Sequence, residues 1–156
     1  MKRILCCSIT SAALFAIAAL VGCKIERATI IPSDVPSLNK PATQLAREAQ
    51  LRFPFPADLE RGGEIAGRAE IGYSLNSISL LNFSGQTWTD VDLWINREYV
   101  VNLSEVPSNK LITINFKHLF NDQGVHYPTR NVQTKVAKVE LRQGVRVFDL
   151  PSQAGR

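Results

Sequence analysis

Hydrophobic and polar positions divide the chain into three stretches of different character. Residues 4 to 22 contain no charged side chain, whereas residues 24 to 64 mix polar side chains with five prolines. From Ile65 onward, short apolar segments alternate with polar positions and are separated by Gly, Asn, Asp and Pro. An alternation of period two is typical of β-strands that bury one face. The pattern therefore predicts a leader, a tether and a β domain over residues 65–156.

The β domain is predicted from about seven alternating segments. They are residues 71–75, 78–80, 91–95, 99–103, 111–116, 137–142 and 145–150. No segment is followed by a long amphipathic helix, so a parallel α/β fold is not expected. Ile78 and Leu80 are out of phase with Ile71, which predicts a bulge or bend near Asn76-Ser77. We expect a mainly β fold, an antiparallel β-sandwich.

Turn residues indicate how these segments are connected. Residues 91–95 and 99–103 flank Asn96-Arg97-Glu98, which predicts a hairpin. Further turns are expected at residues 83–86 and 120–124, where a glycine lies among polar residues.

The stretch between the leader and the β domain, residues 23–64, is predicted to be a tether. Its prolines are Pro32, Pro36, Pro41, Pro54 and Pro56. Proline interrupts long regular elements. One short helix is expected over residues 41–52, because Pro41 suits the first helical position and Leu45 and Ala49 share one face. The two phenylalanines of Phe53-Pro-Phe-Pro56, which ends this helix, can dock on the domain that follows.

The first 22 residues have the layout of a secretory signal peptide, with a basic start and an apolar helical stretch. The run Leu20-Val21-Gly22-Cys23 resembles the lipobox of bacterial lipoproteins. The resemblance implies that the Cys23 thiol receives a diacylglyceryl group, that cleavage follows Gly22, and that the new amine is acylated. In Gram-negative lipoproteins an aspartate after the cysteine favours the inner membrane, so Lys24 implies the outer membrane. The alternatives are a retained transmembrane helix or ordinary signal cleavage.

Cysteine and charge counts exclude several kinds of chemistry. Cys6, Cys7 and Cys23 are the only cysteines, so a lipidated mature chain has no free thiol for a disulfide, thiol catalysis or a cysteine metal site. Lys2 and Arg3 leave with the leader, which reduces the formal charge of +4 to near +2. This charge is not typical of a nucleic-acid-binding protein.

The order of residues in the β domain resembles a known class of module. The arrangement from Leu81-Asn82 through Trp88, Val91 and Tyr99 to residues 120–124 is similar to small immunoglobulin-like or fibronectin-like sandwiches of bacterial exported proteins. Such modules bind, space or brace other components, although the fold alone does not determine a function.

One strand offers a candidate ligand face. Trp88, Asp90, Asp92 and Trp94 share parity, so an unbroken strand places two indoles and two carboxylates together. Aromatic rings and carboxylates of this kind can bind a sugar. In the alternative interpretation, which we favour, Trp88 caps the core and Trp94 lies under a loop or the tether. The two carboxylates would lie about 7 Å apart without an enclosing pocket, so hydrolase activity is not expected.

A second constellation was considered as a metal site and set aside. His118, Asp122 and His126 recur every four residues, but Gly124 and Pro128 disfavour the helix that would align them. No cofactor or metal is expected.

These observations lead to one expected function and two alternatives. We expect a non-catalytic envelope lipoprotein, held at the membrane through Cys23, whose domain binds or braces a protein or glycan partner. The alternatives are a carbohydrate-binding module that uses Trp94 and a structural linker between membrane and wall.

Overall fold

The computed structural model describes residues 29–129 and 135–155 and shows a mainly β protein. The leader and Cys23 lie outside the described residues, as do the predictions made for them. The elements are η1 (Pro36–Leu38), α1 (Ala42–Gln50), β1 (Glu60–Glu64), β2 (Gly67–Gly72), β3 (Ser77–Asn82), β4 (Trp88–Ile95), β5 (Tyr99–Val106), β6 (Leu111–Asn115), η2 (Phe116–His118), β7 (Val139–Gln143), β8 (Arg146–Asp149) and β9 (Ser152–Ala154).

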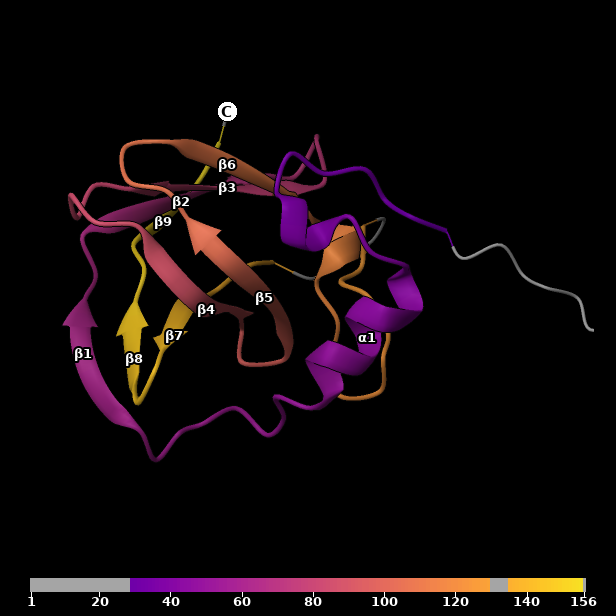
Figure 1. The fold of residues 1–156 in the computed structure, drawn as a ribbon, viewed down its shortest axis with the longest axis horizontal. Helices are drawn as coiled ribbons and strands as arrows, with labels where there is room; N and C mark the ends of the chain where they lie inside the picture. The colour runs from indigo at the N-terminus through magenta and orange to yellow at the C-terminus, as the bar shows by residue number, and fades with distance from the viewer. Residues whose placement is uncertain (1–28, 130–134, 156) are drawn as a thin grey trace, which may run out of the picture.

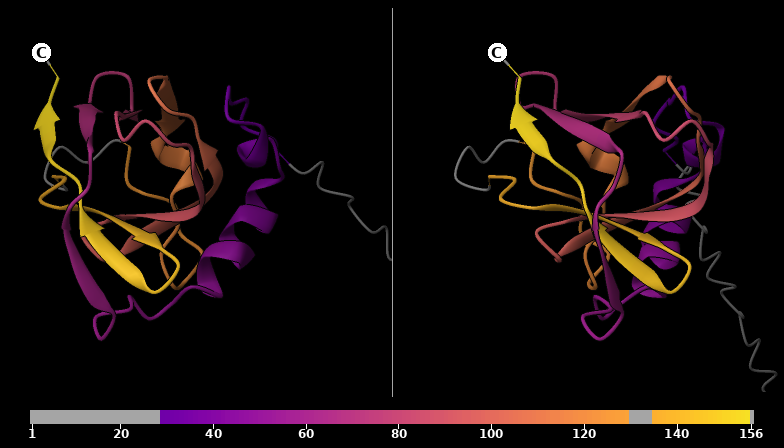
Figure 2. Two further views of the ribbon diagram at one scale, coloured as in Figure 1. Left: turned by 60° about the vertical axis from the view of Figure 1, so that its left-hand side comes forward. Right: turned by 90° about the vertical axis from the view of Figure 1, so that its left-hand side faces the viewer.

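The strands form two open sheets. One has five strands in the order β1-β8-β7-β4-β5, and the other has four in the order β6-β3-β2-β9. In Figure 1 the four-stranded sheet lies along the top and the five-stranded sheet below it, and Figure 2 shows the same two groups of strands from the side. Both sheets contribute to one hydrophobic core, with Ile78 and Leu80 from β3 and Val91 and Leu93 from β4.

Both sheets are mixed, so the expectation of purely antiparallel sheets is wrong. β1 pairs with β8 in parallel, and β9 pairs with β2 in parallel. Neither β1 nor β9 was predicted as a strand. Their residues are polar or small and mostly exposed, so they lack the apolar alternation that marks the inner strands.

The bulge or bend expected near Asn76-Ser77 is a bend. There β2 and β3 form a hairpin whose turn lies between Gly72 and Ser77. Each strand buries its own alternate residues, which explains the change of phase. The hairpin of β4 and β5 is confirmed, and Asn96 and Arg97 have φ values of 55° and 61° at its turn. Positive φ at two successive turn residues matches the right-handed twist of the strands.

The segment that was expected to be a tether packs as part of the domain. Val35 and Leu38 are buried around η1, and Leu45 and Ala49 are buried on one face of α1. The short helix is therefore confirmed, and it rests against β5. Proline residues are compatible with a packed segment of this kind as well as with a flexible tether.

The strand β4, between β7 and β5, is buried on both faces from Val91 onward. Val91, Leu93 and Ile95 face the shared core, whereas Asp92 and Trp94 are covered from the other side. The cover is the chain that follows α1, as the next subsection describes. In a strand with two covered faces, the residues that point to each face must be compatible with burial.

Replacing Leu38 tests whether the N-terminal segment belongs to the core. Leu38 is fully buried and Leu51, at the end of α1, is 85% exposed. We expect Leu38→Ala to lower the free energy of unfolding by about 2–5 kcal/mol, and Leu51→Ala to change it by less than about 0.5 kcal/mol. Urea denaturation of both variants measures this. Equal, small effects would mean that residues 29–64 do not contribute to the core.

Candidate functional site

Of the predicted ligand face, Trp88, Asp92 and Trp94 are buried and only Asp90 is exposed. Trp88 is 4% exposed, and its indole Nε1 donates a hydrogen bond to Ser84 Oγ at 2.9 Å. Trp94 is fully buried, with the rings of Phe53 and Phe55 against it at centroid distances of 5.1 and 5.2 Å in edge-on geometry. The interpretation that Trp88 caps the core and Trp94 lies under the preceding segment therefore agrees with the structure. Neither indole presents a ring face on which a sugar could stack.

The two carboxylates of this strand lie in different environments. Asp92 is buried and accepts hydrogen bonds from Arg52 at 2.5 Å, Asn102 at 2.8 Å and Arg142 at 3.2 Å. Asp90 is exposed, has a φ of 48°, and accepts a bond from the same Asn102 at 3.0 Å. Asp92 thus holds the chain after α1 to the sheet through Arg52. Its bonds to both arginines assign it a structural role in the fold.

A second buried carboxylate, Glu140 of β7, links β7 to β1 and to the β4–β5 turn within the five-stranded sheet. Glu140 is 1% exposed and accepts bonds from Arg61 at 2.6 Å, Arg97 at 2.9 Å and Lys138 at 3.1 Å. The Arg97 guanidinium also lies 4.8 Å from the centre of the Phe55 ring. Burial by itself would raise the pKa of Glu140, but the hydrogen bonds from these three cations outweigh it and lower the pKa to about 2.

The low pKa of Glu140 predicts a loss of stability in acid. Because the folded pKa lies below the ordinary value of 4.5, the stabilisation is complete above that value and is lost as the pH falls towards 2. The shift corresponds to about 3 kcal/mol at 1.36 kcal/mol per pKa unit. Urea unfolding across this range should show the loss in the native chain. The Glu140→Gln variant should be less stable at neutral pH and should not show this loss of stability in acid. If the stability of the variant fell with pH as in the native chain, Glu140 would not be its source.

The residues considered as metal ligands are not brought together. His118 is buried, and its Nε2 lies 3.1 Å from the Ile31 carbonyl oxygen, whereas His126 Nδ1 lies 2.9 Å from the Tyr127 carbonyl oxygen. Asp122 is exposed in the turn between them. Among residues 29–129 and 135–155, no three His, Cys, Asp or Glu side chains are placed to hold a metal ion.

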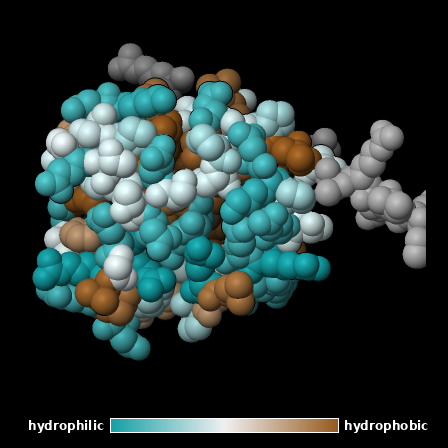
Figure 3. Space-filling view, in the orientation of Figure 1, coloured by the Kyte–Doolittle hydropathy of each residue, from teal (hydrophilic) through white to brown (hydrophobic). Residues whose placement is uncertain are grey.

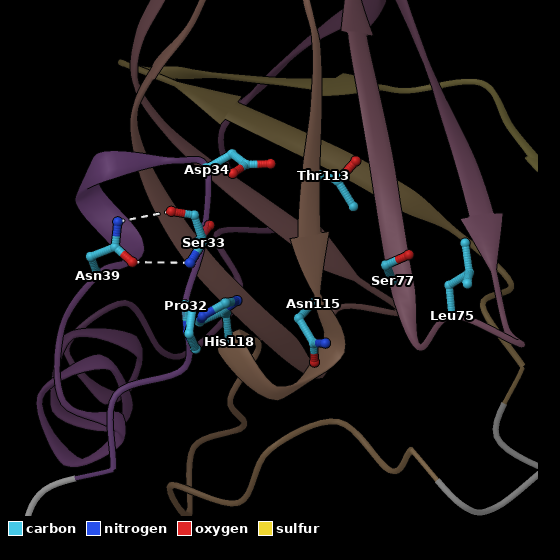
Figure 4. A pocket seen from close by; sticks show the side chains of 9 residues that line it. All are labelled: Pro32, Ser33, Asp34, Asn39, Leu75, Ser77, Thr113, Asn115 and His118. Atoms are coloured by element: carbon cyan, nitrogen blue, oxygen red, sulfur yellow. Dashed lines mark hydrogen bonds between the residues drawn. The ribbon is translucent and has the colours of Figure 1, made fainter.

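A polar hollow of about 400 Å³ is the best candidate site in the described part of the chain. Figure 4 shows that the segment carrying Ser33 and Asp34 bounds one side and that Leu75 and Ser77 bound the other. We call it the polar hollow, and its lining consists of Pro32, Ser33, Asp34, Asn39, Leu75, Ser77, Thr113, Asn115 and His118. It therefore lies where the start of the described chain crosses the outer face of the four-stranded sheet.

Local structure explains how each side of the polar hollow is held. Ser33 and Asn39 exchange two hydrogen bonds, from Ser33 N to Asn39 Oδ1 at 2.9 Å and from Asn39 Nδ2 to the Ser33 carbonyl at 2.8 Å. Val35 and Leu38, buried between them, fix this loop to the core. On the sheet, Ile112 and Ile114 face inward, so the alternation of β6 turns Thr113 outward, into the hollow.

The polar hollow is lined by neutral hydrogen-bonding groups, one carboxylate, and the apolar side chains of Pro32 and Leu75. Burial lowers the pKa of His118, and its backbone hydrogen bonds to Ile31 and Asn115 offset only part of that shift, so the ring is uncharged at neutral pH. Asp34 is then the charged group of the lining. The arrangement can bind a polar segment that offers hydrogen-bond donors, and a basic group is favoured over an acidic one.

Sequence reasoning missed this site because half of it lies in the predicted tether. Ser33, Asp34 and Asn39 were placed in an extended linker, and no pattern in the chain links them to β6. One signal was present, since Val35 and Leu38 are apolar residues three apart around Pro36, as in a short packed turn.

Comparisons with known proteins give no relative on which to base a function. No protein family, curated protein or solved structure matches the chain. Within the described ranges, no helix has both the length and the apolar character needed to cross a bilayer.

Proposed function

We propose that this chain is a non-catalytic envelope lipoprotein, anchored through Cys23 in the outer membrane, with a partner-binding domain of the immunoglobulin-like β-sandwich type. The leader and the run Leu20-Val21-Gly22-Cys23 support the anchor. Two sheets around one core support the sandwich.

The observation that carries the proposal is how soon after Cys23 the chain becomes part of the domain. The Thr29 carbonyl accepts a hydrogen bond from Ala42 N at 3.3 Å, and Ile30 pairs with Pro41. Thr29 follows Cys23 by six residues, which span at most about 22 Å when fully extended. An anchored domain would therefore stay beside the bilayer.

The polar hollow supports a protein segment as the partner. It is formed by the residues that follow this short connection, so an anchor at Cys23 places it close to the membrane surface. A segment of an envelope protein near its exit from the bilayer can enter it, donating hydrogen bonds to Asp34 and the neighbouring hydroxyl and amide groups. A stacked sugar is less favoured, because Trp88 and Trp94 are both buried.

Replacing the lipidated residue tests the anchor. We expect the native chain to fractionate with membranes and to carry acyl chains on Cys23 by mass spectrometry, because several acyl chains hold a protein stably at a bilayer. Cys23→Ser should leave the membrane fraction and lose radioactive fatty-acid labelling. An unmodified native chain, or a Cys23→Ser variant that is still labelled, would refute the anchor.

A photo-crosslinking residue at position 113 tests the polar hollow in living cells. Thr113 lines the hollow and Thr89 is an exposed threonine of β4 on the other sheet, which makes it a matched control. We expect one envelope protein to be captured from position 113 but not from position 89, with a lower yield in the Asp34→Asn variant. Capture from both positions alike, or of glycan alone, would contradict the proposed partner.

A further inference from the structure

The outer face of the four-stranded sheet carries an exposed apolar patch. Leu81 of β3 and Leu111 of β6 lie directly opposite each other, and Phe83 follows just after the end of β3, two residues after Leu81. Phe83 is 47% exposed and Leu111 is 57% exposed. We call these three residues the apolar patch. In Figure 3 single hydrophobic residues are visible at the upper, right-hand and lower edges of a mostly hydrophilic surface.

Basic side chains flank the apolar patch. Arg68 of β2 lies opposite Leu81 in the sheet, and Lys110 directly precedes Leu111. Both are exposed, and neither forms an ion pair with another described residue. Apolar residues beside free cations are typical of surfaces that meet anionic lipid headgroups.

The other end of this face is also apolar and lies near the start of the described chain. Leu75, in the turn between β2 and β3, is 75% exposed and lines the polar hollow on the side opposite Pro32. Ile30, only seven residues after Cys23, is 53% exposed. The outer side of the five-stranded sheet differs, because Phe53 and Phe55 cover Trp94 there. Exposed apolar groups thus occur towards both ends of the outer face of the four-stranded sheet.

We propose that the outer face of the four-stranded sheet lies against the bilayer, with Phe83 and Leu111 at the boundary of the hydrocarbon and Arg68 and Lys110 among the phosphates. The inference rests on the proposed anchor at Cys23. A connection of about 22 Å allows this face to reach the bilayer. The middle of the face is polar, with Ser79, Thr113 and Glu70, so contact is made mainly at its ends. The polar hollow then opens toward the headgroups, where a juxtamembrane segment can enter it.

Single cysteines read out this orientation directly. The lipidated mature chain has no free thiol, so Phe83→Cys and Leu111→Cys each introduce one. Val145→Cys is the control, because Val145 is 73% exposed in the turn between β7 and β8, on the other sheet. Each purified lipoprotein is labelled with an environment-sensitive dye and reconstituted into vesicles of phosphatidylethanolamine and phosphatidylglycerol. Lipids with a quencher on the acyl chain are then added at increasing fractions.

We expect quenching at positions 83 and 111 to be roughly twofold or more stronger than at position 145, since interfacial side chains enter the boundary by about 5–10 Å. Arg68→Glu with Lys110→Glu should reduce that difference, whereas Arg146→Glu, on β8, should not. Equal quenching at all three positions, in lipidated protein that floats with the vesicles, would overturn the inference and leave the anchor standing. Crosslinks between position-83 thiols of two protomers would overturn it too, by making the face a contact between copies. Failure of lipidation would show in the mass spectrum, and would refute the anchor itself.

Discussion

The structure depends on the burial of the second face of β4 under the chain that follows α1. Phe53 and Phe55 lie on Trp94, and Arg52 binds Asp92, so apolar contact and a charged hydrogen bond act on the same short segment. Burial of a carboxylate is unfavourable unless cations and hydrogen bonds compensate for lost hydration. Asp92 has two arginines and an amide as partners. Removal of the covering segment would therefore expose an indole and leave a charge network incomplete.

This packing decides where the domain begins, and thereby constrains its function. If residues 29–64 were a flexible tether, the domain could stand well away from a membrane and turn freely. Because Val35, Leu38 and α1 are part of the core, the proposed anchor at Cys23 would be separated from the domain only by the residues between Cys23 and Thr29. The same packing creates the polar hollow, since one of its sides is the segment that was expected to be loose. The proposed position at the membrane and the proposed binding surface thus both depend on one set of contacts.

The sequence predicts what depends on local periodicity and fails where pairing is long-range. Alternation predicts the hairpin of β4 and β5, and the position of proline predicts the helix α1. The aromatic residues before the β domain predict the covering of Trp94. β1 and β9 are missed because backbone pairing along β8 and β2, not apolar burial, makes them strands. The ion pair of Arg52 with Asp92 joins residues forty positions apart, and the bond of Arg61 with Glu140 joins residues still further apart. A single sequence contains charged residues of both signs but does not say which ones meet.

In the proposed arrangement, the acyl chains supply the affinity for the membrane and the sheet face supplies the orientation. A short linker gives the domain an effective concentration at the bilayer in the millimolar range. A face whose own dissociation constant is about 1 mM, equivalent to about 4 kcal/mol, would therefore be in contact for a large part of the time. The few side chains of the apolar patch and the two cations beside it can supply a binding free energy of this size, although they would not keep a domain without an anchor at the membrane. A weak face on a short anchor thus fixes the direction of the polar hollow and still allows the domain to lift and admit a partner.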